Sequence, residues 1–136
     1  LRIYDGTRPA TGGTATKARL YIGAITGTPT INFKMGIYNV SGGSPIASGS
    51  GTIVGGVDDL AYKEITFDTP VSVSSSTSYL VAWIMSTDAA SAPVRYKASS
   101  DNWKSKLAFG YANFPGTLPT PDFDLSRGYA VGVYVD

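Results

Sequence analysis

The feature that most constrains the fold is a strict alternation between apolar residues and polar or small ones. It is clearest in the segment 31–40, where apolar residues occupy every second position. The two sets are Ile31, Phe33, Met35 and Ile37 on one side, and Asn32, Lys34, Gly36 and Tyr38 on the other. A period of two over this length is typical of a β-strand with one buried face and one face in water. The segment is therefore predicted to be a half-buried strand.

Similar short segments recur along the chain, and Gly, Pro, Ser or Asp residues separate them. No stretch between them combines the period and the length of a helix. Short strands with regular turn signals predict one all-β domain over residues 1–136, either a β-sandwich or a barrel. The predicted strands are 1–4, 15–22, 31–40, 46–54, 61–67, 78–85, 94–98, 106–111 and 129–135.

The sequence also indicates where some of these strands lie. Segment 46–54 is rich in Gly and Ser and is expected at a sheet edge, whereas 78–85 is apolar on both sides and is expected at a sheet centre, with Trp83 in the core. Segment 61–67 is expected to end at Thr69-Pro70. Because the first and last strands of such sandwiches often lie side by side, we expect 1–4 to pair near 129–135.

Segment 15–22 has two predicted faces. Alternation places Lys17, Arg19 and Tyr21 on one side and Thr16, Ala18, Leu20 and Ile22 on the other. The second set is the apolar one, so we expect it to face the core.

The residue content excludes several kinds of chemistry. The chain has no histidine, which excludes a Ser-His-Asp triad, and no cysteine. No pair among its ten acidic residues has spacing that marks a glycosidase site. A net charge of +1 does not favour nucleic acid as a partner, and no apolar run is long enough for a membrane span. We therefore predict a protein that is not an enzyme, and its low charge and many hydroxyl groups favour an extracellular or surface-exposed location (secreted, cell surface or virion).

Two acidic motifs supply oxygen atoms of the kind that calcium binds. They are Asp58-Asp59 and the Asp122/Asp124 pair, and neither matches an EF-hand loop. The alternative is that these residues solvate or cap turns. No cofactor is expected beyond a structural calcium ion at such a loop, and no ligand is assigned to it.

Parts of the sequence resemble a known kind of module. Segments 36–38 and 41–45 read Gly-Ile-Tyr and Ser-Gly-Gly-Ser-Pro, and segments 67–73 and 78–82 read Phe-Asp-Thr-Pro-Val-Ser-Val and Ser-Tyr-Leu-Val-Ala. These stretches, and the aromatic and proline-rich segment 109–119, resemble turns and strand ends of secreted or surface bacterial and phage modules of the carbohydrate-binding kind. The resemblance covers most of the chain and implies an antiparallel, jelly-roll-like β-sandwich of eight to nine strands. It assigns no functional residue, because such modules share turns rather than sites.

The aromatic residues between 95 and 123 give the candidate binding site. Trp103 lies in a polar stretch that is expected to be a loop, so its ring is either exposed or folded over a sheet edge. Sugar rings present apolar C–H faces edged by hydroxyls, and a flat aromatic with polar side chains at its rim suits them. The candidate ligand-binding residues are Trp103, Phe114, Tyr111, Asp101, Asn102, Lys104 and Asn113. Tyr96, Phe109 and Tyr111 are in phase with apolar neighbours, and core packing is the alternative for them.

These features predict two alternative roles. The first is a non-catalytic extracellular module that binds polysaccharide or a cell-surface glycan through aromatic-bearing loops. The second is a structural subunit of an extracellular assembly, such as a phage capsid or tail decoration protein or a filament subunit. In that role strand edges would contact copies of the same chain or other subunits.

Overall fold

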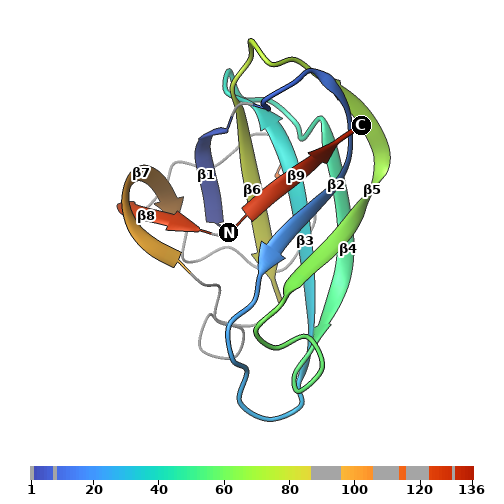
Figure 1. Cartoon of the computed structure of the whole chain (residues 1–136), viewed down its shortest axis with the longest axis vertical. Helices are drawn as coiled ribbons and strands as arrows, with labels where there is room; N and C mark the ends of the chain where they lie inside the picture. The colour runs from blue at the N-terminus through green and yellow to red at the C-terminus, as the bar shows by residue number, and fades with distance from the viewer. Residues whose placement is uncertain (1, 8, 87–95, 106–113, 116–122, 130) are drawn as a thin grey trace.

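The computed structural model describes residues 2–7, 9–86, 96–105, 114–115, 123–129 and 131–136 (Figure 1). All regular structure in these residues is β-strand, so the all-β prediction is confirmed for this part of the chain. The strands are β1 (Arg2–Thr7), β2 (Gly13–Tyr21), β3 (Thr30–Asn39), β4 (Ala47–Val54), β5 (Tyr62–Val73), β6 (Tyr79–Met85), β7 (Tyr96–Ser105), β8 (Phe123–Tyr129) and β9 (Val131–Val135). For β1, β7 and β8 we describe the backbone pairing alone.

The strands form two antiparallel sheets. One has six strands in the order β4-β3-β6-β1-β7-β8, and the other has three in the order β5-β2-β9. The predicted edge position of 46–54 and the central position of 78–85 are both confirmed, as β4 and β6. Predicted segment 106–111 lies outside the described residues, and β8 was not predicted.

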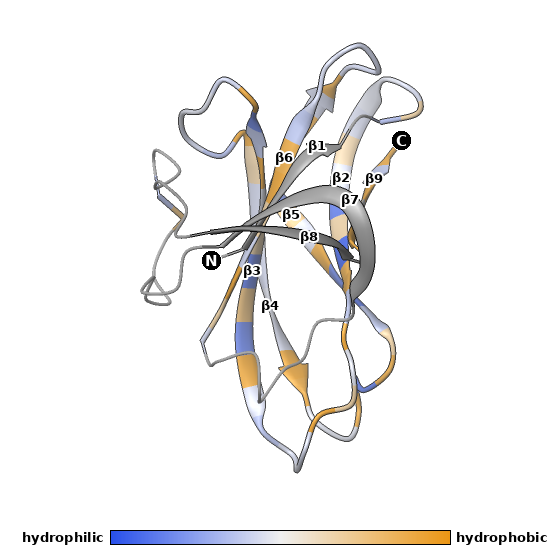
Figure 2. Cartoon of the chain, turned by 90° about the vertical axis from the view of Figure 1, so that its left-hand side faces the viewer, coloured by the Kyte–Doolittle hydropathy of each residue, from blue (hydrophilic) through white to orange (hydrophobic). Residues whose placement is uncertain are grey.

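The two sheets share one apolar core, which gives a sandwich-like arrangement. Alternation along β3 puts its apolar side chains on the inner side, and Figure 2 shows the alternating bands of hydropathy. Burying these side chains is the main favourable term in folding. The buried cluster takes Ile31, Phe33, Met35, Ile53, Val81 and Trp83 from the larger sheet and Ala18, Leu20, Ile65 and Phe67 from the smaller one. The inner face predicted for β3 and the core position of Trp83 are therefore confirmed.

A β-bulge in β2 changes the side to which one side chain points, relative to the prediction. The register of β2 against both β5 and β9 shifts between Ala15 and Lys17. An extra residue at such a shift changes which side chains face inward. Ala15 and Ala18 are both fully buried, whereas Thr16 donates a hydrogen bond to Asp136 at the surface. The prediction that Thr16 faces the core is wrong, and that for Ala18 is confirmed.

The pairing of the chain ends differs from the prediction. β1 lies between β6 and β7 in the larger sheet, whereas β9 pairs with β2 in the smaller one. Because both hydrogen-bonding sides of β1 are occupied, the predicted pairing of 1–4 near 129–135 is wrong.

Strand β5 is longer than predicted and passes through Pro70. Its pairing with β2 stops at Thr66 and resumes at Val71, across the register shift. A proline has no N–H to donate to a ladder. Pro70 is therefore tolerated because it lies where the ladder is interrupted.

At one edge of the fold the two sheets approach very closely. A Cβ atom on Gly49 of β4 would overlap the backbone carbonyl oxygen of Thr66 in β5, and one on Gly51 would lie 2.9 Å from Ile65 Cγ2. The glycines of β4 are thus a requirement of packing as well as a mark of an edge strand.

The outer face of the larger sheet is partly covered. Tyr38 was predicted on the wet face of its strand, but it is fully buried, together with Ala82 of β6. Leu80 and Phe114 pack against this second, smaller apolar cluster. The prediction for Tyr38 is wrong because residues far along the chain cover this face.

Candidate functional site

The structure places part of the predicted site in a strand. Trp103 belongs to β7, where it is paired with Tyr4 of β1 and Leu125 of β8. The prediction that this stretch is a loop is wrong, because neighbouring strands pair with its backbone on both sides. Asp101, Asn102 and Lys104 belong to the same strand. Tyr111 and Asn113 lie outside the described residues.

Phe114 is the predicted site residue whose surroundings are described. Its ring packs edge-on against Tyr38, with centroids 6.0 Å apart and planes at 82°. The ring also lies against Gly36, where a Cβ atom would be 3.1 Å from Phe114 Cε2. The Tyr38 hydroxyl donates a hydrogen bond to the carbonyl oxygen of Pro115 at 3.1 Å, which holds this segment to the sheet. Burial raises the pKa of the Tyr38 hydroxyl, so Tyr38 stays a neutral donor.

Phe114 lines a hollow of about 360 Å³. The other lining residues come from β3, β4, β5 and the turn before β4, and they are Lys34, Pro45, Ser48, Gly49, Ser50 and Asp68. We call this the Phe114 hollow. It offers one aromatic ring, a cation, a carboxylate and two hydroxyls, and its volume is at the lower end of the range of ligand pockets.

A second set of functional groups covers the outer face of the smaller sheet. We call it the tyrosine–arginine face, and it consists of Tyr21, Tyr62, Tyr134, Arg19, Glu64 and Lys17. In the β2–β5 register, Tyr21 is directly opposite Tyr62 and Arg19 opposite Glu64. In the β2–β9 register, Lys17 is opposite Tyr134. Side chains that are directly opposite on paired strands point to the same side of a sheet, and so does every second side chain along one strand. These residues therefore share one surface.

Arg19 is at the centre of this face. Its Cζ atom lies over the ring of Tyr62, 4.4 Å from the centroid, and over that of Tyr134 at 5.1 Å. Its Nη1 atom donates a hydrogen bond to Tyr134 Oη at 3.0 Å, and this hydroxyl donates to Glu64 Oε1 at 2.6 Å. The hydrogen bond to Glu64 raises the pKa of Tyr134.

Tyr21 extends the face toward the β4–β5 turn. It meets Tyr62 edge to face, with centroids 5.1 Å apart, and its hydroxyl donates to the Leu60 carbonyl oxygen at 2.7 Å. Leu60 has a φ of 54°, which is uncommon for a residue with a side chain, and it is 54% exposed. The contact with Tyr21 therefore fixes a strained residue at the border of the face.

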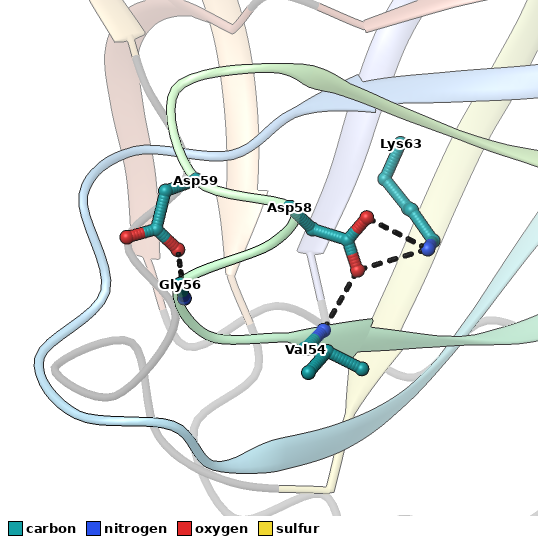
Figure 3. A network of polar contacts seen from close by, with 5 residues as sticks. All are labelled: Val54, Gly56, Asp58, Asp59 and Lys63. Carbon is teal, nitrogen blue, oxygen red and sulfur yellow. Dashed lines mark hydrogen bonds and ion pairs between the residues drawn. The ribbon is translucent and has the colours of Figure 1, made fainter.

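Asp58 and Asp59 fix the same turn (Figure 3). Asp58 accepts hydrogen bonds from Lys63 Nζ at 2.9 Å through both oxygens and from Val54 N at 2.7 Å. Asp59 accepts from Gly56 N at 3.0 Å and from Ile25 N at 3.3 Å. Burial alone would raise the pKa of Asp58, but the bonds from Lys63 and Val54 and the charge of Lys63 outweigh it and lower the pKa. These contacts agree with the turn-capping interpretation of Asp58-Asp59.

The calcium hypothesis gains no support from the described residues. They contain no group of three or more acidic, histidine or cysteine side chains that could share a metal ion. Asp122 lies outside them, and Asp124 is described by its backbone alone.

Sequence reasoning missed the tyrosine–arginine face as a site, although part of its signal was present. Alternation placed Lys17, Arg19 and Tyr21 together on an outward side. What the sequence does not contain is the register that sets Tyr62 and Tyr134 on either side of Arg19.

Comparison with known protein families, curated proteins and solved structures found no match to this chain. Among the described residues, no helix has the length and apolar character to cross a membrane.

Proposed function

We propose that this chain is a non-catalytic, extracellular or surface-exposed module that binds carbohydrate at the Phe114 hollow. The observation that carries the proposal is the anchored aromatic ring of Phe114 beside hydroxyl, carboxylate and ammonium groups. A pyranose has the matching chemistry, with apolar C–H faces for the ring and hydroxyls for the polar rim. Tyr38 and Gly36 hold the Phe114 side chain in place before a ligand arrives, which lowers the entropy lost on binding.

The expected affinity is modest. One ring that covers about 60 Å² of apolar sugar surface contributes about 1.5 kcal/mol. Hydrogen bonds at the rim bring the dissociation constant to roughly the millimolar range. A module of this strength works through repetition or tethering to a partner.

We also propose a jelly-roll-like topology of the kind that the sequence resemblance implies. It is supported by two antiparallel sheets and by pairs between strands far apart in the chain, such as β2 with β9 and β3 with β6. Long connections between sheets produce pairs of this type in Greek-key folds.

Affinity gel electrophoresis in neutral polysaccharides (galactomannan, xyloglucan and mixed-linkage glucan) tests the binding proposal. We expect at least one polymer to retard the protein, and we expect Phe114→Ala and Asp68→Ala to reduce the retardation. Asp68 is exposed, so its removal tests the hollow without unfolding the chain. Tyr62→Ala changes a residue of the smaller sheet that does not line the hollow, so it is the matched control and should bind normally. No retardation in any of these polymers, or retardation that neither variant changes, would contradict the proposal.

A structural subunit is the second candidate, and one observation favours it. β9 is at an edge of the smaller sheet, where β2 is its partner among the described strands. An edge strand offers backbone N–H and C=O groups to another chain. Light scattering after size-exclusion chromatography distinguishes the roles, because a strict monomer at high concentration excludes assembly through this edge.

A further inference from the structure

The side chains of the tyrosine–arginine face contact one another although several of them are open to solvent. Six polar or aromatic side chains from three strands meet on it, and hydrogen bonds, cation–π contacts, an edge-to-face ring contact and an ion pair join them into one network. Exposed ion pairs and cation–π contacts add little to the stability of a fold. The network therefore holds these groups in place without burying them.

Arg19 is oriented by its neighbours. Rings from both flanking strands pack against the guanidinium group, and one of its N–H groups is bonded to Tyr134. The residue opposite it on β9 is Gly132, which places no side chain beside it. A guanidinium group held in this way presents its remaining N–H groups along its edge, as a planar fork.

The tyrosine–arginine face has one more positively charged side chain than negatively charged ones. Glu64 accepts the Tyr134 hydrogen bond at 2.6 Å, and its other oxygen is 4.0 Å from Lys17 Nζ. The side chains of Lys17 and Glu64 are 48% and 43% exposed, so this pair is open to solvent. No carboxylate of the described residues forms an ion pair with Arg19. Two cations and one carboxylate give the face a formal charge of +1.

Tyr62 supplies an apolar surface next to this cation. It is 46% exposed although Arg19 and Tyr21 both contact it. A ligand that suits the face therefore needs a carboxylate for the fork of Arg19 and a flat apolar side for Tyr62. A uronic acid has both, because its carboxylate is attached to a pyranose ring with C–H faces.

We propose that the tyrosine–arginine face is a second binding site, for a carboxylate-bearing saccharide whose carboxylate binds Arg19 and whose ring packs on Tyr62. This site shares no residue with the Phe114 hollow, which is lined by Phe114, the turn before β4, residues of β3 and β4, and Asp68 of β5, and which has been assigned a neutral sugar. Fork-to-fork hydrogen bonding favours Arg over Lys for a carboxylate.

Affinity gel electrophoresis in polygalacturonate, alginate and hyaluronan is the test, with neutral galactomannan and dextran sulfate as comparison polymers. We expect retardation by at least one carboxylated polymer that exceeds the retardation by dextran sulfate at equal charge density. We expect Arg19→Gln and Tyr62→Ala each to weaken it about tenfold or more, and Arg19→Lys to weaken it several-fold although the charge remains.

The controls separate this site from general charge and from the first proposal. Lys34→Gln removes one positive charge on the other sheet and should leave binding to the carboxylated polymer unchanged, as should Phe114→Ala. The unfolding midpoint of each variant shows whether it is folded. If binding is absent in galactomannan, xyloglucan and mixed-linkage glucan but carboxylate binding depends on Arg19, the Phe114 proposal fails and this one stands.

Four outcomes would overturn the inference. They are no retardation in any of the three carboxylated polymers, equal retardation by dextran sulfate, equal losses in Lys34→Gln and Arg19→Gln, and a folded Tyr62→Ala variant that binds like the unchanged protein.

Discussion

Tyr38 joins two parts of the chain that are 77 residues apart. Its hydroxyl donates to the Pro115 carbonyl oxygen, and its ring packs against Phe114, while the whole residue is 0% exposed. A buried hydrogen bond of this kind is costly to leave unmade. One residue thus stabilises the larger sheet and positions the aromatic wall of the proposed sugar site.

Tyr38→Phe should lower the free energy of unfolding by about 1 kcal/mol, because the Pro115 carbonyl oxygen loses its donor. Urea denaturation measures the change. Tyr21→Phe removes a hydroxyl that is bonded at the exposed surface, so it is a matched control and should cost less. Equal losses in the two variants would show that the Tyr38 bond has no special role.

At the scale of elements, strand β4 and the turn after it determine how the two sheets meet. The small residues Gly49 and Gly51 let β5 approach closely, and the turn that follows is held by Asp58 and Asp59. Figure 3 shows the Asp58 carboxylate between the end of β4 and Lys63 at the start of β5. The same turn ends beside Tyr62, so it also positions one border of the tyrosine–arginine face.

Gly49→Ala should destabilise the fold by about 1 to 3 kcal/mol, because the added methyl group overlaps the backbone of β5 and cannot be accommodated by a rotamer change. Ser50→Ala is the control on the same strand, since Ser50 is exposed and its change should cost little. Thermal or urea unfolding measures both. A stable Gly49→Ala variant would mean that β4 and β5 are further apart than described.

The Asp58–Lys63 pair predicts a dependence of stability on pH. The pKa of Asp58 is lowered in the folded state, so its contribution is fully present above the ordinary value of about 4 and is lost as pH falls through the folded pKa. Asp58→Asn should lower the free energy of unfolding at pH 7 by about 2 kcal/mol, because it weakens hydrogen bonds to a charged group, and it should flatten the decrease at acid pH. Urea titrations between about pH 2 and pH 7 measure this. Lys63→Met, which removes the partner, should flatten the curve as well, and parallel curves for all three proteins would contradict the assignment.

For the molecule as a whole, one core connects both sheets while their outer faces carry different chemistry. The buried cluster includes Leu20 from the smaller sheet and Phe33 from the larger one, each 0% exposed. The tyrosine–arginine face is on the outer side of the smaller sheet and the Phe114 hollow takes residues from β3, β4 and β5, and the side chains that line them are not part of that core cluster. A shared core also means that the two sheets should not unfold separately.

Leu20→Ala and Phe33→Ala should each lower the stability of the same cooperative transition, by about 3 kcal/mol or more. Far-UV circular dichroism and tryptophan fluorescence should follow one curve, with Trp83 of β6 among the reporters in the core. Thr52→Ala, on the exposed side of β4, is the control. Two separate transitions, one sensitive to each substitution, would show that the sheets have independent cores.

The sequence by itself predicted most of the extended segments and, for β3 and most of β2, which side chains face inward, but it missed β8 and predicted a loop where residues 99–105 of β7 lie. A period of two is a local property, because successive side chains of a strand point to opposite faces whatever its neighbours are. The core positions of Phe33 and Leu20 and the outward positions of Arg19 and Tyr21 follow from it, whereas the core position of Trp83 follows from a segment that is apolar on both sides. Of the predicted site residues, the structure describes the side chain of Phe114, and the polar residues beside it, such as Lys34, Ser48 and Asp68, are not those that the sequence suggested.

The tertiary structure alone decided which strands are neighbours. Alternation does not say that β1 pairs with β6 and β7, or that β9 completes the smaller sheet beside β2. It also gives no sign that Phe114 covers Tyr38. Tyr38 is therefore fully buried, although its position in the alternation predicts that it faces solvent. The tyrosine–arginine face arises in the same way, from three strands that are distant in sequence. Pairing depends on the free energy of the whole assembled core, and no segment carries that information within its own residues.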